Sequence, residues 1–170
     1  MAEPESAPKT KRDIWRRRAL EALVFLVALY GIHRWQTRGV AEGSAPALEA
    51  TDIDGEPVVL RGPALVHFWA TWCGVCDAMD GNVASVAEEA NVVSVAVRSE
   101  GPAAIRAHLR DEELEGAFPV IPDPDGALAA EWGVSAFPTT FAIDESGEIV
   151  AVSVGYTTTA GLRARLAVAD

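Results

Sequence analysis

The segment from His67 to Asp80 reads HFWATWCGVCDAMD and holds the only two cysteines of the chain, Cys73 and Cys76. It begins inside a nearly unbroken apolar run, Ala64 to Ala70, which is typical of a strand buried on both faces. Residues 74–90 then show a helical pattern of apolar positions. The two thiols are therefore expected where a buried strand passes into a helix.

The spacing of the two cysteines favours redox chemistry. Cys73 is expected at the helix N-terminus, where unpaired backbone N–H groups and the helix dipole stabilise a thiolate. Such a position lowers a cysteine pKa from ~8.5 into a range of about 3.5–7.5. We therefore predict that Cys73 is the attacking nucleophile and that Cys76 is the shielded resolving thiol. The intervening Gly74 and Val75 do not determine the direction of electron flow.

Other uses of two close thiols fit the sequence less well. A structural disulfide at this spacing would close a very small loop and remove little entropy from the unfolded chain. A closed zinc site needs four ligands, so His67 and His108 would both have to reach the two thiols. Covalent haem attachment requires the pattern C-x-x-C-H, but residue 77 is Asp77. A metal- or haem-binding module is thus the weaker alternative.

Composition and charge narrow the class of partner. The chain has 170 residues, of which 49% are hydrophobic, and this is too apolar for a disordered protein. Residues 1–40 carry eight Lys or Arg against four acidic residues, whereas residues 41–170 carry six against twenty-one. An acidic body lacks the clustered basic residues that phosphate binding needs, so no nucleic-acid partner is expected.

The basic N-terminal residues precede an apolar run from Ala19 to Ile32. Trp15 and Trp35 bracket this run at positions suited to the two interfaces of a membrane. The sequence predicts that the chain has four parts. These are a basic cytoplasmic tail (residues 1–18), a transmembrane anchor (19–35), a linker (36–46) and a folded domain (47–170).

The placement of basic residues before the run puts the N-terminus in the cytoplasm. The expected location is the cytoplasmic (inner) membrane, with one crossing and the folded domain in the periplasm or extracytoplasmic space. The run has only fourteen residues and includes Glu21, whereas a membrane span needs about 17 to 25. A cleaved signal peptide and an interfacial helix therefore stay open as alternatives.

The body alternates between strand and helix patterns. A hairpin with an Asp54-Gly55 turn comes first, before the buried strand that leads to the cysteines. The later elements are expected as strands at 92–97, 139–144 and 148–156, as a short extended piece at 118–123, and as helices at 101–113, 125–133 and 157–169. This order predicts an α/β fold, with a central mixed sheet flanked by helices on both faces.

Two segments carry a resemblance to a known family. FWATWCGVC, residues 68–76, resembles the active-site segment of the thioredoxin superfamily, and SAFPTTFAID, residues 135–144, resembles its second hallmark, a loop that ends in a cis-proline. The resemblance covers about residues 46–170 and implies a thioredoxin-like fold. It also implies that Pro138 faces the disulfide and leaves the backbone of Phe137 open to a substrate strand.

Within the superfamily, the N-terminal segment and APALEATDIDGEPVVL (residues 45–60) resemble the membrane-anchored TlpA/ResA-like and cytochrome c maturation branch. The Gly-Val dipeptide and GYTTTAGLRARL (155–166) are most similar to the copper-sensitivity suppressor protein D group. These resemblances imply a protein thiol–disulfide oxidoreductase that acts on protein thiols or disulfides. They favour a reductant whose disulfide is reduced again by a membrane-embedded thiol electron transporter. An oxidant of the same fold is the alternative. No cofactor is expected beyond the redox-active disulfide Cys73–Cys76.

One residue departs from the family pattern. Thioredoxins place a buried Asp six residues before the first cysteine, and here that position is His67. A neutral imidazole there either accepts the proton of the resolving thiol or fills space with a hydrogen-bond partner. Asp77 and Glu100 are acidic alternatives. The predicted site residues are the catalytic Cys73, Cys76 and Pro138, supported by Trp72, Gly74, Val75, Phe137, Thr139 and His67.

Overall fold

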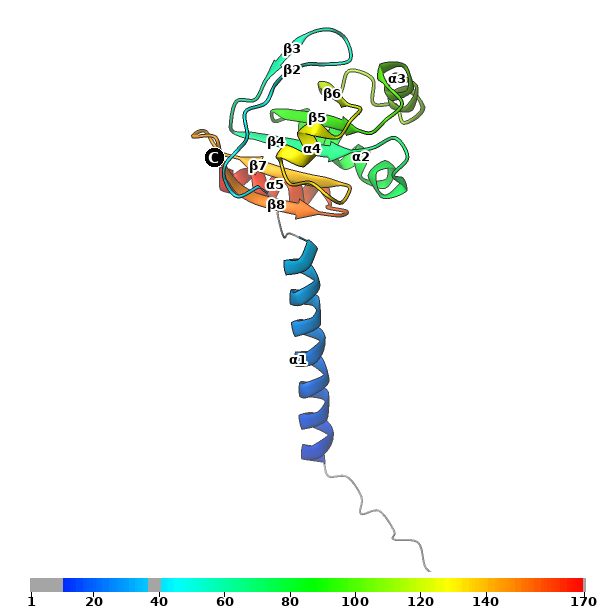
Figure 1. Cartoon of the computed structure of the whole chain (residues 1–170). Coiled ribbons are helices and arrows are strands. Elements are labelled where there is room, and N and C mark those ends of the chain that lie inside the picture. The colour runs from blue at the N-terminus through cyan, green and yellow to red at the C-terminus, as the bar shows by residue number, and fades with distance from the viewer. Residues whose placement is uncertain (1–10, 37–40, 170) are drawn as a thin grey trace, which may run out of the picture. The chain divides into compact units, whose positions relative to one another are not determined.

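A computed structural model describes residues 11–36 and 41–169, and the chain divides after residue 38 into two compact units. The first is helix α1, Lys11–Gln36. The second is an α/β domain (Figure 1). Across the described residues, no helix has the length and apolar content that crossing a membrane requires.

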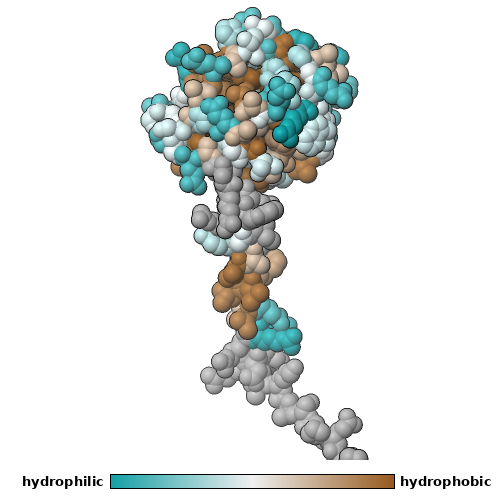
Figure 2. Space-filling model, viewed as in Figure 1, coloured by the Kyte–Doolittle hydropathy of each residue, from teal (hydrophilic) through white to brown (hydrophobic). Residues whose placement is uncertain are grey.

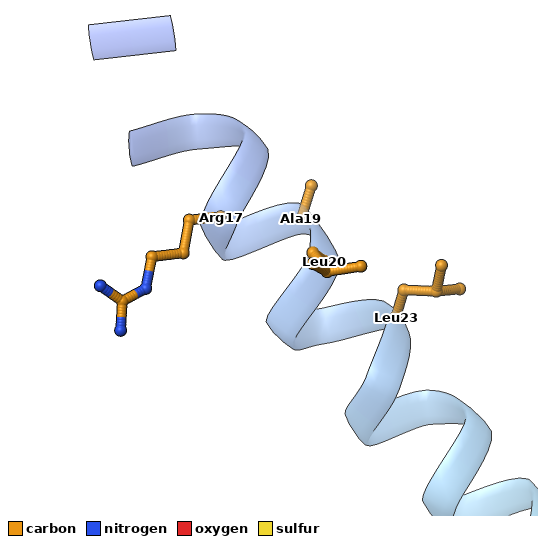
Figure 3. Close-up of a pocket in the computed structure, with 4 residues that line it drawn as sticks. All are labelled: Arg17, Ala19, Leu20 and Leu23. Carbon is orange, nitrogen blue, oxygen red and sulfur yellow. The ribbon is translucent and has the colours of Figure 1, made fainter. Parts of the chain in front are cut away.

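Helix α1 contains the segment predicted as an anchor, residues 19–35, and also residues 11–18 of the predicted tail. Part of this helix is brown in Figure 2, which marks hydrophobic residues. Its large exposed hydrophobic side chains include Leu20, Leu23, Val24, Phe25, Leu26, Val27 and Tyr30. Glu21, the one acidic residue of the apolar run, pairs with Arg17 at 2.8 Å. A surface pocket is lined by Arg17, Ala19, Leu20 and Leu23, with Arg17 extended away from the leucines (Figure 3). The anchor stays a prediction, and residues 1–10 of the tail and 37–40 of the linker lie outside the described residues.

The domain is organised around a six-stranded mixed sheet with the order β1-β8-β7-β4-β5-β6. The strands β4, β5 and β6 are parallel, and the other pairings are antiparallel. The bounds are β1 Gly43–Ser44, β4 Ala64–Trp69, β5 Val92–Val97, β6 Val120–Asp123, β7 Thr139–Ile143 and β8 Glu148–Val154. A separate hairpin joins β2 (Glu49–Thr51) to β3 (Pro57–Val59).

Four helices complete the domain, namely α2 Gly74–Ala87, α3 Pro102–Asp111, α4 Ala127–Glu131 and α5 Thr159–Ala169. Alternate side chains of β4 point to opposite faces of the sheet. Leu65 and Trp69 pack in the clusters that contain α2, α3 and α5, whereas Val66 and Phe68 pack with the hairpin and with Trp132 after α4. In Figure 1, α4 lies in front of the sheet and α5 behind β7 and β8.

The predicted thioredoxin-like architecture, a mixed sheet with helices on both faces, is confirmed. The buried run gives β4, residues 92–97 form β5 as expected, and the hairpin turns at Asp54-Gly55. Residues 120–123 lie in the piece expected only as extended, and they form the edge strand β6. One further strand was not expected. Within the predicted linker, Gly43 and Ser44 pair with Ile149 and Glu148 and so add the edge strand β1 to the sheet. Two residues are too few to show any hydrophobic period.

Candidate redox active site

The cysteine pair lies at the junction of β4 and α2, as the sequence predicts. Cys73 and Cys76 form a disulfide with their Cα atoms 5.2 Å apart. Cys73 is the N-cap of α2 and keeps 9% of its surface exposed, while Cys76 lies one turn inside and is 0% exposed. Solvent and partner proteins therefore reach Cys73 rather than Cys76.

Backbone N–H groups of the first turn of α2 lie close to Cys73. The N–H of Cys76 points to the Sγ of Cys73 at 3.3 Å, and the N–H groups of Cys76 and Asp77 also approach the Cys73 carbonyl oxygen, at 2.7 and 3.2 Å. Hydrogen-bond donors and the positive end of a helix dipole stabilise negative charge at this position. When the disulfide is reduced, the same arrangement favours the thiolate of Cys73.

Exposed side chains border the disulfide. Trp72 is 62% exposed and Val75 is 50% exposed, and Gly74 between the cysteines is also exposed. The indole N–H of Trp72 donates to the carbonyl oxygen of Arg98 at 3.2 Å, which fixes the ring beside the end of β5. The motif therefore presents an apolar rim rather than a polar one.

The second predicted segment lies next to this rim. The Phe137–Pro138 peptide bond is cis, and the Phe137 ring meets the Trp72 ring edge-on with centroids 5.8 Å apart. Phe137 also packs against the apolar cluster that contains both cysteines. The fold thus brings together two segments that are more than sixty positions apart in sequence.

Hydrogen bonds hold the loop around Pro138 from both sides. The N–H of Gly155 donates to the carbonyl oxygen of Pro138, and the hydroxyl of Thr139 donates to the carbonyl oxygen of Ala136, both at 2.8 Å. No hydrogen bond from another described residue reaches the backbone N–H or C=O of Phe137. These two groups are available to an incoming extended segment.

His67 lies in β4 on the face of the sheet that carries Leu65 and Trp69, and it is fully buried. Its Nδ1 is 2.9 Å from the Oγ1 of Thr140, the residue opposite it in β7. Nε2 has no hydrogen-bond partner among the described residues. Burial lowers the pKa of His67 to about 4, so the imidazole is neutral at physiological pH.

His67 belongs to a row of buried polar residues. Strand pairing aligns it with Ser94 on one side, and with Thr140 and then Ser153 on the other. Ser94 accepts the indole N–H of Trp69, whereas the hydroxyl of Ser153 has no partner among the described residues. Both interpretations of His67 are compatible with this geometry, because one ring nitrogen has a partner and the other is free.

Asp80 and His108 form a pair that the sequence does not predict. Asp80 lies one turn after Cys76 on α2 and is buried, and its Oδ2 is 3.2 Å from Nε2 of His108 on α3. The His108 ring also packs on Trp69, with centroids 5.0 Å apart. Burial raises the pKa of Asp80 to about 6, although His108 opposes the shift. A spacing of four on a helix places Cys76 and Asp80 on one face, but nothing local connects either to His108.

The zinc site that would use both cysteines is not formed in the described part of the chain. Potential metal ligands converge there only at Asp77, Asp80 and His108, and this group contains no cysteine. His108 contacts Asp80 and Trp69, and His67 bonds to Thr140. Glu100, considered as an acidic alternative, is exposed beyond the end of β5.

Comparison with known proteins identifies the family. The model of the Redoxin family matches residues 41–166. The chain belongs to the Redoxin family. The match spans both the cysteine motif and the cis-proline loop, so the two hallmarks on which the resemblance rests lie within one Redoxin domain.

Several proteins similar to this Redoxin chain are named as thioredoxin-like or thiol–disulfide exchange proteins. A thioredoxin-like protein from Haemophilus influenzae is 28% identical over 91% of this chain and 94% of its own length. The thiol-disulfide oxidoreductase ResA of Bacillus subtilis is 30% identical over 86% of this chain and 88% of its own. The crystal structure of a putative thiol:disulfide interchange protein DsbE from Chlorobium tepidum matches with a TM-score of 0.63 and 27% identity, covering 77% of this chain and 99% of that one.

Proposed function

We propose that this Redoxin-family chain is a thiol–disulfide oxidoreductase that reduces disulfides of extracytoplasmic proteins. The observation that supports exchange chemistry is that Cys73 and Cys76 differ in burial and in their backbone surroundings. Cys73 is the helix N-cap, and a backbone N–H points at its sulfur, while Cys76 is fully buried. An activated outer thiol and a protected inner thiol are what sequential disulfide exchange requires.

The reaction balances in two steps. The Cys73 thiolate attacks one sulfur of a substrate disulfide, a Cys73–substrate disulfide forms, and the other substrate sulfur leaves as a thiolate. Cys76 then loses its proton and attacks Cys73, which releases the second substrate thiolate and leaves the Cys73–Cys76 disulfide. Two electrons pass from the cysteine pair to the substrate. The pair is reduced again by a thiol donor, for which we propose a membrane-embedded electron transporter.

The substrate is proposed to bind as an extended segment beside Phe137. The free backbone N–H and C=O of Phe137 are able to pair with it by strand addition. Trp72 and Val75 offer exposed apolar surface on the cysteine side of the same region. Apolar surface of this kind at a reactive centre is typical of protein-binding sites.

We also propose that α1 attaches the domain to a membrane on its extracytoplasmic side. The support is the set of exposed apolar side chains on α1, together with the basic residues that precede them and the pairing of Glu21 with Arg17. At that location the proposed roles are cytochrome c maturation, or support of a disulfide isomerase under copper stress. An oxidant of the same fold is the second candidate, since the Cys-Gly-Val-Cys sequence is compatible with either direction.

Trapping tests the exchange mechanism. In a Cys76→Ser variant expressed in cells, substrates should remain covalently bound to Cys73 and should be released by dithiothreitol. The Cys73→Ser variant is the control and should trap nothing. Absence of any trapped protein in Cys76→Ser would count against the mechanism. Cytochrome c precursors among the trapped proteins would support the maturation role.

The direction of electron flow is tested by the reduction potential. Equilibration with glutathione or dithiothreitol should give a value nearer to about −270 mV, as in thioredoxin, than to about −120 mV, as in a strong periplasmic oxidant. A value at the oxidising end would replace the reductant proposal with the oxidant one. A value below about −300 mV without trapped partners would indicate an inert structural disulfide.

A further inference from the structure

A hollow adjoins the cis-proline loop of the domain. Its volume is about 260 Å³, and its walls combine apolar residues with one cation. The residues that matter for its chemistry are Val97, Arg98, Gly126, Val134, Ser135 and Phe137. Phe137 also contacts Trp72 and packs on the apolar cluster that contains both cysteines. The hollow and the redox site therefore share Phe137 and are adjacent.

Arg98 is tied to the redox site through its backbone. Its carbonyl oxygen accepts the indole N–H of Trp72, and its N–H donates to the carbonyl oxygen of Asp123 at 2.8 Å. Its φ is +48°, a left-handed conformation that is uncommon for a residue other than glycine. The residue therefore leaves β5 in a fixed direction beside the active-site loop.

The Arg98 side chain lies along Gly126. A Cβ atom added at Gly126 would stand 3.0 Å from Nε of Arg98, which is tighter than normal van der Waals contact, and Gly126 itself has a φ of +73°. Glycine at this position thus leaves room for the guanidinium group against the wall of the hollow. Arg98 remains exposed there.

The charge of Arg98 has no partner in the described part of the domain. Three other arginines form ion pairs, namely Arg106 with Asp54, Arg110 with Glu115 and Arg163 with Glu89. No carboxylate or carbonyl of a described residue accepts a hydrogen bond from the Arg98 guanidinium. Acidic residues outnumber basic ones by twenty-one to six in residues 41–170. A positive charge without an ion-pair partner beside the redox site is therefore unusual for this domain.

We propose that this hollow is a subsite for a substrate side chain, and that it takes an Asp or Glu located near the reacting cysteine of the substrate protein. The inference rests on the proposed exchange function and adds the chemistry by which a partner is selected. The guanidinium of Arg98 binds the carboxylate, and Val97 and Val134 contact the methylene groups. Ser135 lines the same hollow. Because acidic residues outnumber basic ones in residues 41–170, Arg98 offers a positive charge that few other positions of the domain can offer a carboxylate.

A peptide series tests the subsite. Each peptide contains one cysteine joined as a mixed disulfide to 2-mercaptoethanol, and carries Asp, Asn or Lys at one of the two positions before or after that cysteine. The second-order rate of reaction with the reduced full-length protein is measured for each. At one or more positions the Asp peptide should react about tenfold faster than its Asn counterpart, because a hydrogen bond between a guanidinium and a carboxylate is stronger than one to a neutral amide.

Variants assign the preference to Arg98. Arg98→Gln should remove the ratio between Asp and Asn peptides, Arg98→Lys should keep part of it, and Arg98→Glu should favour the Lys peptide. Arg163→Gln changes the net charge equally but lies on α5, where Arg163 pairs with Glu89, and it should keep the full ratio. The ratio is taken within each variant, so a change in overall reactivity does not affect it.

Two outcomes would overturn the subsite. They are equal rates for the Asp, Asn and Lys peptides with the wild-type protein, or a ratio that persists in Arg98→Gln. Reduction of hydroxyethyl disulfide, a small neutral compound, distinguishes failure of the subsite from failure of the exchange function. If the wild-type protein does not reduce this small compound, the proposed exchange function itself is wrong.

Discussion

Nε2 of His108 lies 3.2 Å from Oδ2 of Asp80, and this contact joins α3 to α2 one helical turn beyond Cys76. Asp80 is buried, and its pKa is raised to about 6 mainly by loss of solvent, with His108 acting in the opposite direction. A carboxylate with a pKa near neutrality is better suited to accept a proton at pH 7 than His67, whose pKa is lowered to about 4.

The first prediction concerns the step in which Cys76 attacks the mixed disulfide. The rate of this step in single-turnover reduction of a disulfide peptide should rise through pH 6, as Asp80 loses its proton. In Asp80→Asn the rate at pH 7 should fall by about 10²-fold, the usual size of a general-base effect, and the inflection near pH 6 should disappear. Asp111→Asn changes an exposed carboxylate on α3 and should behave as the wild type. An unchanged inflection in Asp80→Asn would exclude Asp80 as the proton acceptor.

The second prediction concerns the stability that His67 provides. Burial lowers its pKa in the folded state from the ordinary value of 6.5 to about 4, so the unfolded chain takes up a proton first as the pH falls. The contribution of the neutral imidazole is fully present above pH 6.5 and is lost progressively between pH 6.5 and 4. The loss amounts to about 3 kcal/mol at the acid end, from 1.36 kcal/mol per pKa unit.

Urea unfolding of the wild type and His67→Gln measures this effect. The free energy of unfolding should fall more steeply in the wild type than in His67→Gln as the pH is lowered from 6.5 to 4. Parallel curves would show that His67 is not buried in its neutral form. If His67 only fills space and bonds to Thr140, the variant should change the rate of the Cys76 step by less than about tenfold at pH 7.

The sequence predicts the fold well because its strongest patterns are local. The buried run before Cys73 and the alternation that follows it suffice for the order of strands and helices around the site. Phe137 and Pro138 were placed opposite the cysteines by resemblance alone, and the contact of Phe137 with Trp72 comes from the tertiary structure.

The features that the sequence did not predict depend on contacts between distant segments. Asp80 and His108 are twenty-eight positions apart and meet only because α2 and α3 cover the same face of the sheet. The position of Arg98 beside Gly126 depends likewise on how β5 and α4 are placed. No periodic pattern marks such pairs, since each partner is an ordinary polar residue in its own segment.

The third prediction concerns the difference in reactivity between the two thiols. After reduction, iodoacetamide at pH 7 should modify Cys73 at least about tenfold faster than Cys76, because the thiolate fraction and access both favour the N-cap position. Mass spectrometry of the two labelled sites at short reaction times measures the ratio. The reaction of Cys73 should be slower in urea, where the helix N-terminus is lost. Equal labelling in the folded protein would contradict the assignment of nucleophile and resolving thiol.

The fourth prediction concerns Trp72. Its ring is exposed and contacts Phe137, so we expect it to bind protein partners without contributing to folding. Trp72→Ala should lower the second-order rate with a protein disulfide such as insulin by about tenfold, in line with the loss of an aromatic residue at an interface. The rate with hydroxyethyl disulfide should fall much less, because that compound is too small to span Trp72 and Phe137.

A matched control separates this effect from general surface changes. Val59→Ala truncates another exposed hydrophobic side chain, 46% exposed on the β2–β3 hairpin, and should leave both rates unchanged. The midpoint of urea unfolding should agree for the wild type and both variants within the usual range for surface substitutions, about 0.5 kcal/mol. If Trp72→Ala slowed both substrates equally, the indole would act on the reactivity of Cys73 itself, through its hydrogen bond to Arg98, rather than on partner binding.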